Sequence, residues 1–164
     1  CDDIKIRQML LENLIEEERG AANHPELWLR FAEGLGLDRN AVLDREHLEK
    51  TSESVRILKD LARSESPAKG LAALYAYEAQ IPEVSTTKIA GLKEFYGIDS
   101  EAALCFFKVH EKADELHSQA TREALLQLCQ TEEAKEEALL AAEKATFALN
   151  LLLDGVYETY CQAK

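Results

Sequence analysis

The chain contains one long stretch, from Ser100 to Leu153, without a single proline or glycine. Such a stretch predicts helix, because proline and glycine are the residues that most disfavour a helical backbone. At 3.6 residues per turn, His110, Asp114 and His117 fall on one face of this helix. The same face carries Ala103, Phe107, Thr121, Ala124 and Leu128. Two imidazoles and a carboxylate are therefore expected to point into the core, where binding a metal ion would offset the cost of burying them.

The rest of the chain also reads as helices separated by turn residues, and no segment alternates with period two for long enough to form a strand. Asp2 or Asp3 suits a helix start, Gly20 suits a helix end, and Thr51 is expected to cap a later helix. Pro82 is expected to break or kink the helix that begins at Pro67. Helices are predicted at about 3–19, 25–35, 51–63, 67–81, 85–95, 100–129 and 131–153, with a short one within 38–50. This pattern predicts a single all-α helical bundle over residues 1–164.

Two helices have apolar faces that are expected to form part of the core. In the second predicted helix these residues are Leu27, Trp28 and Phe31. In the last helix the expected apolar face consists of Leu139, Leu140, Ala142, Phe147, Leu151 and Leu152.

The composition excludes several classes of function. A formal charge of −12 on 164 residues argues against nucleic acid or an anionic membrane as partner. No apolar run is long enough to span a bilayer, and no secretory signal is present. The four scattered cysteines form no metal-binding pair, so we interpret them as free thiols of a cytoplasmic protein.

Three further residues, from other helices and a loop, extend the set of candidate metal ligands. Glu17 lies on the apolar stripe of the first helix, His24 precedes Pro25, and Glu78 stands among apolar neighbours. Facing helices that bring Glu and His to a common centre are a known way to hold two transition metals, and imidazole with carboxylate favours Fe, Mn or Zn over Ca or Mg.

Each of these residues also has a simpler interpretation. Glu17 at the end of a helix can be exposed, Glu78 can pair with a lysine, and His24 can act only as a helix cap. A hydrogen-bonded polar network is the alternative for the two histidines and the aspartate of the long helix. Lys88 is either an amine in the same cavity or a solvated side chain.

Three segments together resemble a known family. They run from Glu17 to His24, from Ala72 to Pro82 and from Val109 to His117. With them the chain resembles the TENA/PQQ-synthesis-protein-C superfamily, which has the haem-oxygenase-like helical fold. Within it the chain is most similar to the CADD-like group, named for the chlamydial protein associating with death domains. The similarity extends over essentially the whole chain.

The resemblance implies a dinuclear, non-haem metal oxygenase that uses two iron ions, or iron with manganese, and O₂ as co-substrate. The implied ligands are Glu17, His24, Glu78, His110, Asp114 and His117. Among them, Glu78 and Asp114 are candidates for bridging or shifting carboxylates, which the sequence does not rank. Members of this group form para-aminobenzoate for folate by consuming one of their own tyrosines. A lysine is their expected nitrogen source, and Lys88 occupies its position.

The resemblance does not fix the substrate or the class of function. The family has helices before the point where this chain begins, and the consumed tyrosine lies there, so we expect an N-terminally incomplete copy of the domain. The substrate is expected to be an internal tyrosine or a small molecule, such as a fatty acid or an amino-acid derivative. The resemblance is also compatible with a metal-free oxidase of the pyrroloquinoline-quinone type and with a helical module that binds a death domain. A homodimer is a further expectation.

Overall fold

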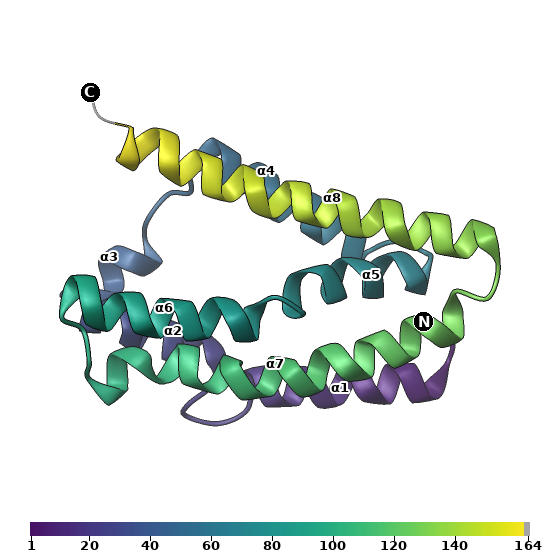
Figure 1. Cartoon of the computed structure of the whole chain (residues 1–164), viewed down its shortest axis with the longest axis horizontal. Helices are drawn as coiled ribbons and strands as arrows, with labels where there is room; N and C mark the ends of the chain where they lie inside the picture. Colours follow the sequence, from purple (N-terminus) through teal and green to yellow (C-terminus); the bar gives the residue numbers. More distant parts are fainter. Residues whose placement is uncertain (163–164) are drawn as a thin grey trace. The chain divides into compact units, whose positions relative to one another are not determined.

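The computed structural model describes residues 1–162, and within them every regular element is helical (Figure 1). This confirms the predicted all-α class. The helices are α1 (Ile4–Glu18), α2 (His24–Gly34), α3 (Arg39–Leu43), α4 (Glu49–Ala62), α5 (Pro67–Glu78), α6 (Ile81–Tyr96), α7 (Glu101–Leu128) and α8 (Glu132–Val156), followed by a short π-helix at Tyr157–Cys161.

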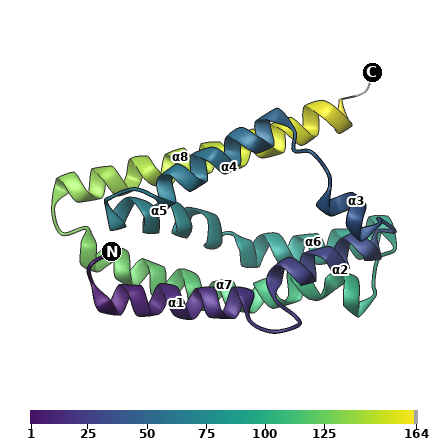
Figure 2. The ribbon, with the colours of Figure 1, turned by 180° about the vertical axis from the view of Figure 1, so that it is seen from behind.

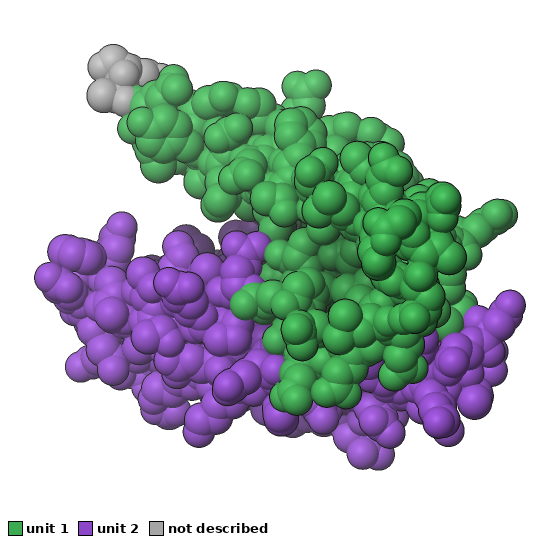
Figure 3. All heavy atoms as spheres, turned by 45° about the vertical axis from the view of Figure 1, so that its right-hand side comes forward, with its two compact units in different colours: residues 1, 46–79, 118–164 green, residues 2–45, 80–117 purple. Residues whose placement is uncertain are grey.

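The chain divides into two compact units, coloured separately in Figure 3. Unit 1 contains residue 1, residues 46–79 and the chain from 118 onward, and so holds α4, α5, α8 and the end of α7. Unit 2 contains residues 2–45 and 80–117, and so holds α1, α2, α3, α6 and the first part of α7. We describe each unit by itself.

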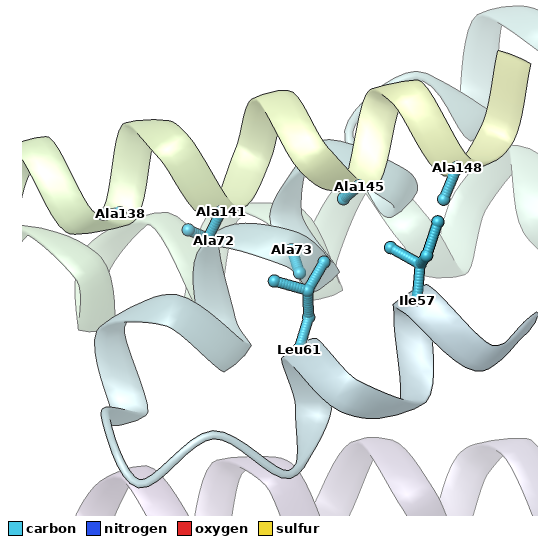
Figure 4. Packing of buried hydrophobic residues seen from close by; sticks show 8 residues of the cluster. All are labelled: Ile57, Leu61, Ala72, Ala73, Ala138, Ala141, Ala145 and Ala148. Carbon is cyan, nitrogen blue, oxygen red and sulfur yellow. The ribbon is translucent and has the colours of Figure 1, made fainter. Parts of the chain in front are cut away.

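Unit 1 is organised around α8, which packs against α4 and α5. Helices α4 and α8 lie side by side in both views of the ribbon (Figures 1 and 2). The residues of α8 that face its partners are alanines, and Figure 4 shows them opposite Ile57 and Leu61 of α4. The buried alanines of α8 are Ala138, Ala141, Ala145 and Ala148. This spacing of three and four residues follows one face of a helix.

The expected apolar face of α8 was wrong for its largest residues. Leu139, Leu140 and Phe147 are each more than half exposed, whereas Ala142 and Leu151 pack at the edge of the alanine cluster. The physical reason is that a stripe of alanines lets two helices approach closely, and that approach turns the larger side chains outward. Gly155 shows the same closeness, because a Cβ atom there would lie 2.9 Å from Cβ of Lys50.

The helix ends of unit 2 follow the expected capping chemistry. The Asp3 side chain accepts hydrogen bonds from the backbone N–H groups of Lys5 and Ile6 and so caps α1. Gly20 has a φ of +83°, which glycine adopts without strain, and it turns the chain after α1. Asn23 caps α2 by accepting from the N–H of Glu26 at 2.9 Å.

Two expected helix starts differ in the structure. Thr51 lies inside α4 rather than at its start, because the helix begins at Glu49 after Leu48, which makes no side-chain cap. The helix that begins at Pro67 already ends at Glu78, before Pro82, and α6 starts at Ile81 rather than at Ser85. A proline needs no N–H partner in the first turn of a helix, so it begins α6 instead of ending a segment before it.

Helix α2 packs closely against α7 within unit 2. A Cβ atom at Gly34 would lie only 2.4 Å from Cβ of Ala103, so no larger residue fits at this crossing without movement. Beside it, Trp28 and Phe31 of α2 meet two phenylalanines of α7 with ring centroids 4.9–6.4 Å apart. Trp28 is 46% exposed, so it flanks this cluster instead of lying in the core as expected.

Candidate metal centre

The three polar residues of α7 are buried, as their helical spacing predicts. His110 and His117 are largely shielded from solvent, and Asp114 is only 3% exposed. All three lie in unit 2, on the part of α7 that runs from Glu101 to residue 117. Helical geometry therefore places two imidazoles and a carboxylate along one buried face.

The end of α1 and the start of α2 bring two more ligating groups to this face. Glu17 lies in the last turn of α1, and His24 is the first residue of α2 after the turn at Gly20. Oε2 of Glu17 lies 2.6 Å from Nδ1 of His24, without the angles of a hydrogen bond. The rings of His24 and His110 lie with their centroids 4.3 Å apart.

These five residues form two overlapping groups, each with ligand atoms within 4.8 Å of one another. One group contains Glu17, His24 and His110, and the other contains Glu17, Asp114 and His117. Glu17 is the member common to both. The bridging or shifting role expected of Asp114 and Glu78 stays a prediction.

Several ligand atoms in the cluster are buried and have no hydrogen-bond partner. They are Nδ1 of His24, Oδ2 of Asp114 and Nδ1 of His117. A buried polar atom without a partner is costly, and most such atoms in native proteins are satisfied. A cation among these atoms would satisfy them, so the donor set fits one or two transition-metal ions.

The electrostatics of Asp114 also favour a bound cation. Burial raises the pKa of Asp114 above its ordinary value, and the negative charge of Glu17 raises it further. The neighbouring imidazoles, that of His110 above all, act in the opposite direction. An ionised carboxylate in such a place destabilises the fold, and a bound cation would favour its charged form.

In each of the two imidazoles of α7, one ring nitrogen contacts an oxygen, and the two oxygens are of different kinds. Nδ1 of His110 donates to the backbone carbonyl of Phe106 over 2.7 Å, one turn earlier in α7. Nε2 of His117 lies 2.8 Å from Oε2 of Glu16 on α1. Sequence reasoning missed Glu16, because it points away from the apolar stripe of α1 and its partner is 101 residues away in the chain.

Two further residues expected in the site are not members of the two ligand groups. Glu78 is buried at the end of α5 and belongs to unit 1, so its role as a ligand beside the other five stays a prediction. Lys88 is exposed on α6 in unit 2, and its role as an amine donor also stays a prediction.

A surface pocket of about 540 Å³ in unit 2 reaches the cluster from the side of α1. Its lining includes Glu12, Glu16 and Arg19 from α1 and its C-terminal end, and His24 from α2. Access from solvent to one of the clustered imidazoles therefore passes two carboxylates and a guanidinium.

No helix among the described residues combines the length and apolar character needed to cross a membrane.

Comparisons with known proteins show the family to which this chain is similar. Residues 2–151 match the family described as iron-containing redox enzymes. The chain is 42% identical over 159 residues to the 4-aminobenzoate synthase of Nitrosomonas europaea, with 97% of this chain and 65% of that protein covered. It is 35% identical over 155 residues to the 4-aminobenzoate synthase of Chlamydia trachomatis, with 94% of this chain and 66% of that protein covered.

A more distant relative is the pyrroloquinoline-quinone synthase of Rhizobium meliloti, which is 28% identical over 170 residues, with 98% of this chain and 63% of that protein covered. The chain thus spans about two thirds of the length of these curated relatives. The match over residues 2–151 and the identities to the synthases confirm the resemblance noted from the three motif segments. The chain belongs to the haem-oxygenase-like family of iron-containing redox enzymes.

Proposed function

We propose that this protein is an O₂-dependent oxidoreductase with two metal ions that takes part in forming 4-aminobenzoate. The observation that carries the proposal is the pair of overlapping ligand groups that share Glu17. Identity of 35–42% to proteins named 4-aminobenzoate synthase supports the choice of product.

In this proposal each group of ligands holds one ion. Glu17, His24 and His110 would bind the first, and Glu17, Asp114 and His117 the second. Glu78 is proposed as a sixth ligand on the strength of the family resemblance. Three carboxylates would then offset most of the charge of two divalent cations, which makes burial of the whole centre less costly. When bound, a pair of iron ions, or iron with manganese, supplies the electrons that reduce O₂.

Residues around His110 orient its imidazole for metal binding. The Phe106 carbonyl can only accept, so Nδ1 of His110 carries the proton and Nε2 keeps a free lone pair for a ligand bond. The rings of Phe106, Phe107 and Trp28 pack together beside His110, with Phe106 and His110 centroids 4.1 Å apart. These rings exclude water from that side of the centre.

The proposed source of the amino group is Lys88, and this assignment rests on the resemblance alone. Its exposed position on α6 within unit 2 leaves the amine accessible. The aromatic substrate is proposed to be a tyrosine of the protein itself or a free aromatic molecule.

The first test is the metal content of protein produced in cells supplied with iron and manganese. We expect close to two transition-metal ions per chain, and we expect His110→Ala and Asp114→Ala to lose tight binding. Retention of two ions by both variants would contradict the assigned site. Lys59→Ala, on the surface of α4, is the matched control and should keep both ions.

The second test identifies the product. Protein expressed from its own start codon in cells fed ¹⁵N-lysine is reduced, exposed to O₂ and analysed by mass spectrometry. Formation of ¹⁵N-labelled 4-aminobenzoate, lost in Lys88→Arg, is the expected result. Unlabelled product would remove the lysine from the proposal, and oxidation of a fatty acid or amino-acid derivative instead would replace the proposed substrate.

A further inference from the structure

A carboxylate outside the ligand groups holds one of the buried imidazoles. Oε2 of Glu16 lies 2.8 Å from Nε2 of His117. The two side chains differ sharply in exposure, at 62% for Glu16 and 5% for His117. The imidazole therefore extends from a solvent-exposed carboxylate on α1 to the buried centre.

The two nitrogens of His117 face different surroundings. Nδ1 is buried, has no hydrogen-bond partner and lies 3.8 Å from Oδ1 of Asp114. Nε2 faces Glu16. Of the two nitrogens, Nδ1 is thus the one that faces the ligand group.

The contact with Glu16 selects one protonation form of the neutral ring. An ionised carboxylate can only accept, so Nε2 carries the proton and donates it in this hydrogen bond. The neutral imidazole then has its lone pair on Nδ1, beside Asp114. A metal ligand needs that lone pair, and a carboxylate on the opposite nitrogen commonly fixes the orientation of a ligating histidine and increases its basicity.

We propose that Glu16 is a positioning residue that fixes the ring orientation and tautomer of His117 for metal binding on the Asp114 side of the centre. This inference rests on the proposed function, because it assumes that the cluster binds metal. The proposal also predicts that the two ligand groups behave differently, because the partner of His110 is a backbone carbonyl and the partner of His117 is a carboxylate. The Asp114–His117 group is the one expected to respond when Glu16 is changed.

The first experiment reads the tautomer without any metal. Long-range ¹H–¹⁵N spectra of the metal-free full chain distinguish the protonated from the unprotonated ring nitrogen. We expect His117 to be protonated at Nε2 in the native chain and to become a mixture of tautomers in Glu16→Ala. Glu12→Ala, one turn earlier and exposed on the same helix, is the control and should leave the His117 signals unchanged. Identical tautomers in the native chain and Glu16→Ala would overturn the inference.

The second experiment measures binding of Mn(II) under anaerobic conditions. In Glu16→Ala we expect the affinity of one of the two ions to fall about 10–100-fold, as typically follows loss of a partner behind a ligand. Glu16→Gln should recover most of this loss, because its amide oxygen still accepts from Nε2–H. A mere contribution to folding would weaken both ions alike and would not be rescued in this way.

The outcomes separate the inference from the proposed function. If the native chain binds two ions and Glu16→Ala binds both with unchanged affinity, the inference fails and the proposed function stands. If the native chain binds no ion, the proposed function fails, and the metal role of Glu16 fails with it. Circular dichroism of each variant confirms that the helices are intact before either result is interpreted.

Discussion

The alanine cluster of unit 1 and the ligand cluster of unit 2 consist of opposite kinds of side chain. Unit 1 is closed by alanines of α8 against aliphatic residues of α4, with small volumes and no charge among them. Unit 2 encloses a centre of imidazoles and carboxylates in which several buried polar atoms have no hydrogen-bond partner. The first arrangement stabilises the fold as it stands, whereas the second costs stability until something binds. The comparison indicates that unit 2 is where the chain gives up stability for function.

The largest expected effect comes from removing the charge at the centre of unit 2. Asp114→Asn keeps the size of the side chain but gives up the anionic ligand, so we expect affinity for the ion on that side to fall more than about 100-fold, beyond the effect of losing an outer partner. Equilibrium binding of Mn(II) measures this. In the metal-free chain the same change should raise the melting temperature, because a buried carboxylate with a raised pKa is replaced by a neutral group.

The contrast between the units fails if Asp114→Asn behaves as an ordinary core mutation. Such a variant would melt earlier than the native chain without metal and would still bind two ions. Asn13→Asp on α1 is a useful comparison, because it adds a carboxylate to unit 2 outside the ligand groups and should leave both ions bound.

The second effect tests the alanine contacts of unit 1. Ala145 is fully buried where α8 meets its partners, so Ala145→Leu should destabilise the fold by about 1–3 kcal/mol through overpacking. Denaturant unfolding of the metal-free chain measures the loss. Metal stoichiometry, measured on the folded variant, should remain that of the native chain. A variant as stable as the native chain would show that the contacts around Ala145 are loose enough to accommodate a leucine side chain.

A third, smaller effect is the pH dependence of the metal-free chain. Burial, followed by the charge of Glu17, raises the pKa of Asp114 in the folded chain above the unfolded value of 3.8. The unfolded chain therefore releases the Asp114 proton at lower pH than the folded chain does. The contribution of protonated Asp114 to the stability of the fold is complete below pH 3.8, and it is lost as the pH rises through the pKa of Asp114 in the folded chain.

The difference between the native chain and Asp114→Asn isolates this dependence. Unfolding free energies of the two should converge toward low pH and separate as the pH rises, with the native chain the less stable. The opposite trend, in which the unfolding free energy of the native chain rises relative to that of the variant as pH rises, would contradict this prediction. It would mean that the pKa of Asp114 is lowered in the folded chain, because neighbouring groups already stabilise its charge. Added metal should reverse the trend, because ligands bind as carboxylates and acid releases the ion.

The same contrast explains what the sequence could reveal. Helical spacing correctly predicted that His110, Asp114 and His117 share a buried face, because a helix fixes side-chain directions locally. The contact of Glu16 with His117 depends on how α1 lies against α7, which no local pattern contains. Glu17 and His24 were candidates from their positions in the sequence as well as from the family resemblance, and the structure brings both to α7. Geometry within unit 2 adds that Glu17 is the member common to both ligand groups.

In unit 1 the local rule gave the wrong side of a helix. Hydrophobicity ranked Leu140 and Phe147 above the alanines of α8, although small residues at three- and four-residue spacing are what allow close helix contact. Composition alone does not distinguish a helix that buries its large residues from one that buries its small ones. The distances between helices decide it.

The smallest expected effect therefore tests the orientation of α8 directly. If Phe147 lay in the core, Phe147→Ala would cost about 3–5 kcal/mol, whereas on an exposed face it should cost no more than about 0.5 kcal/mol. The structure places Phe147 on the exposed side and Ala148 beside it in the core, so Ala148→Leu is the matched change and should cost more than the loss of the whole aromatic ring. Denaturant unfolding of the two variants under identical conditions compares the costs. A reversed order would mean that α8 is rotated about its axis, and the alanine contacts that distinguish unit 1 from unit 2 would then have to be reassigned to its larger residues.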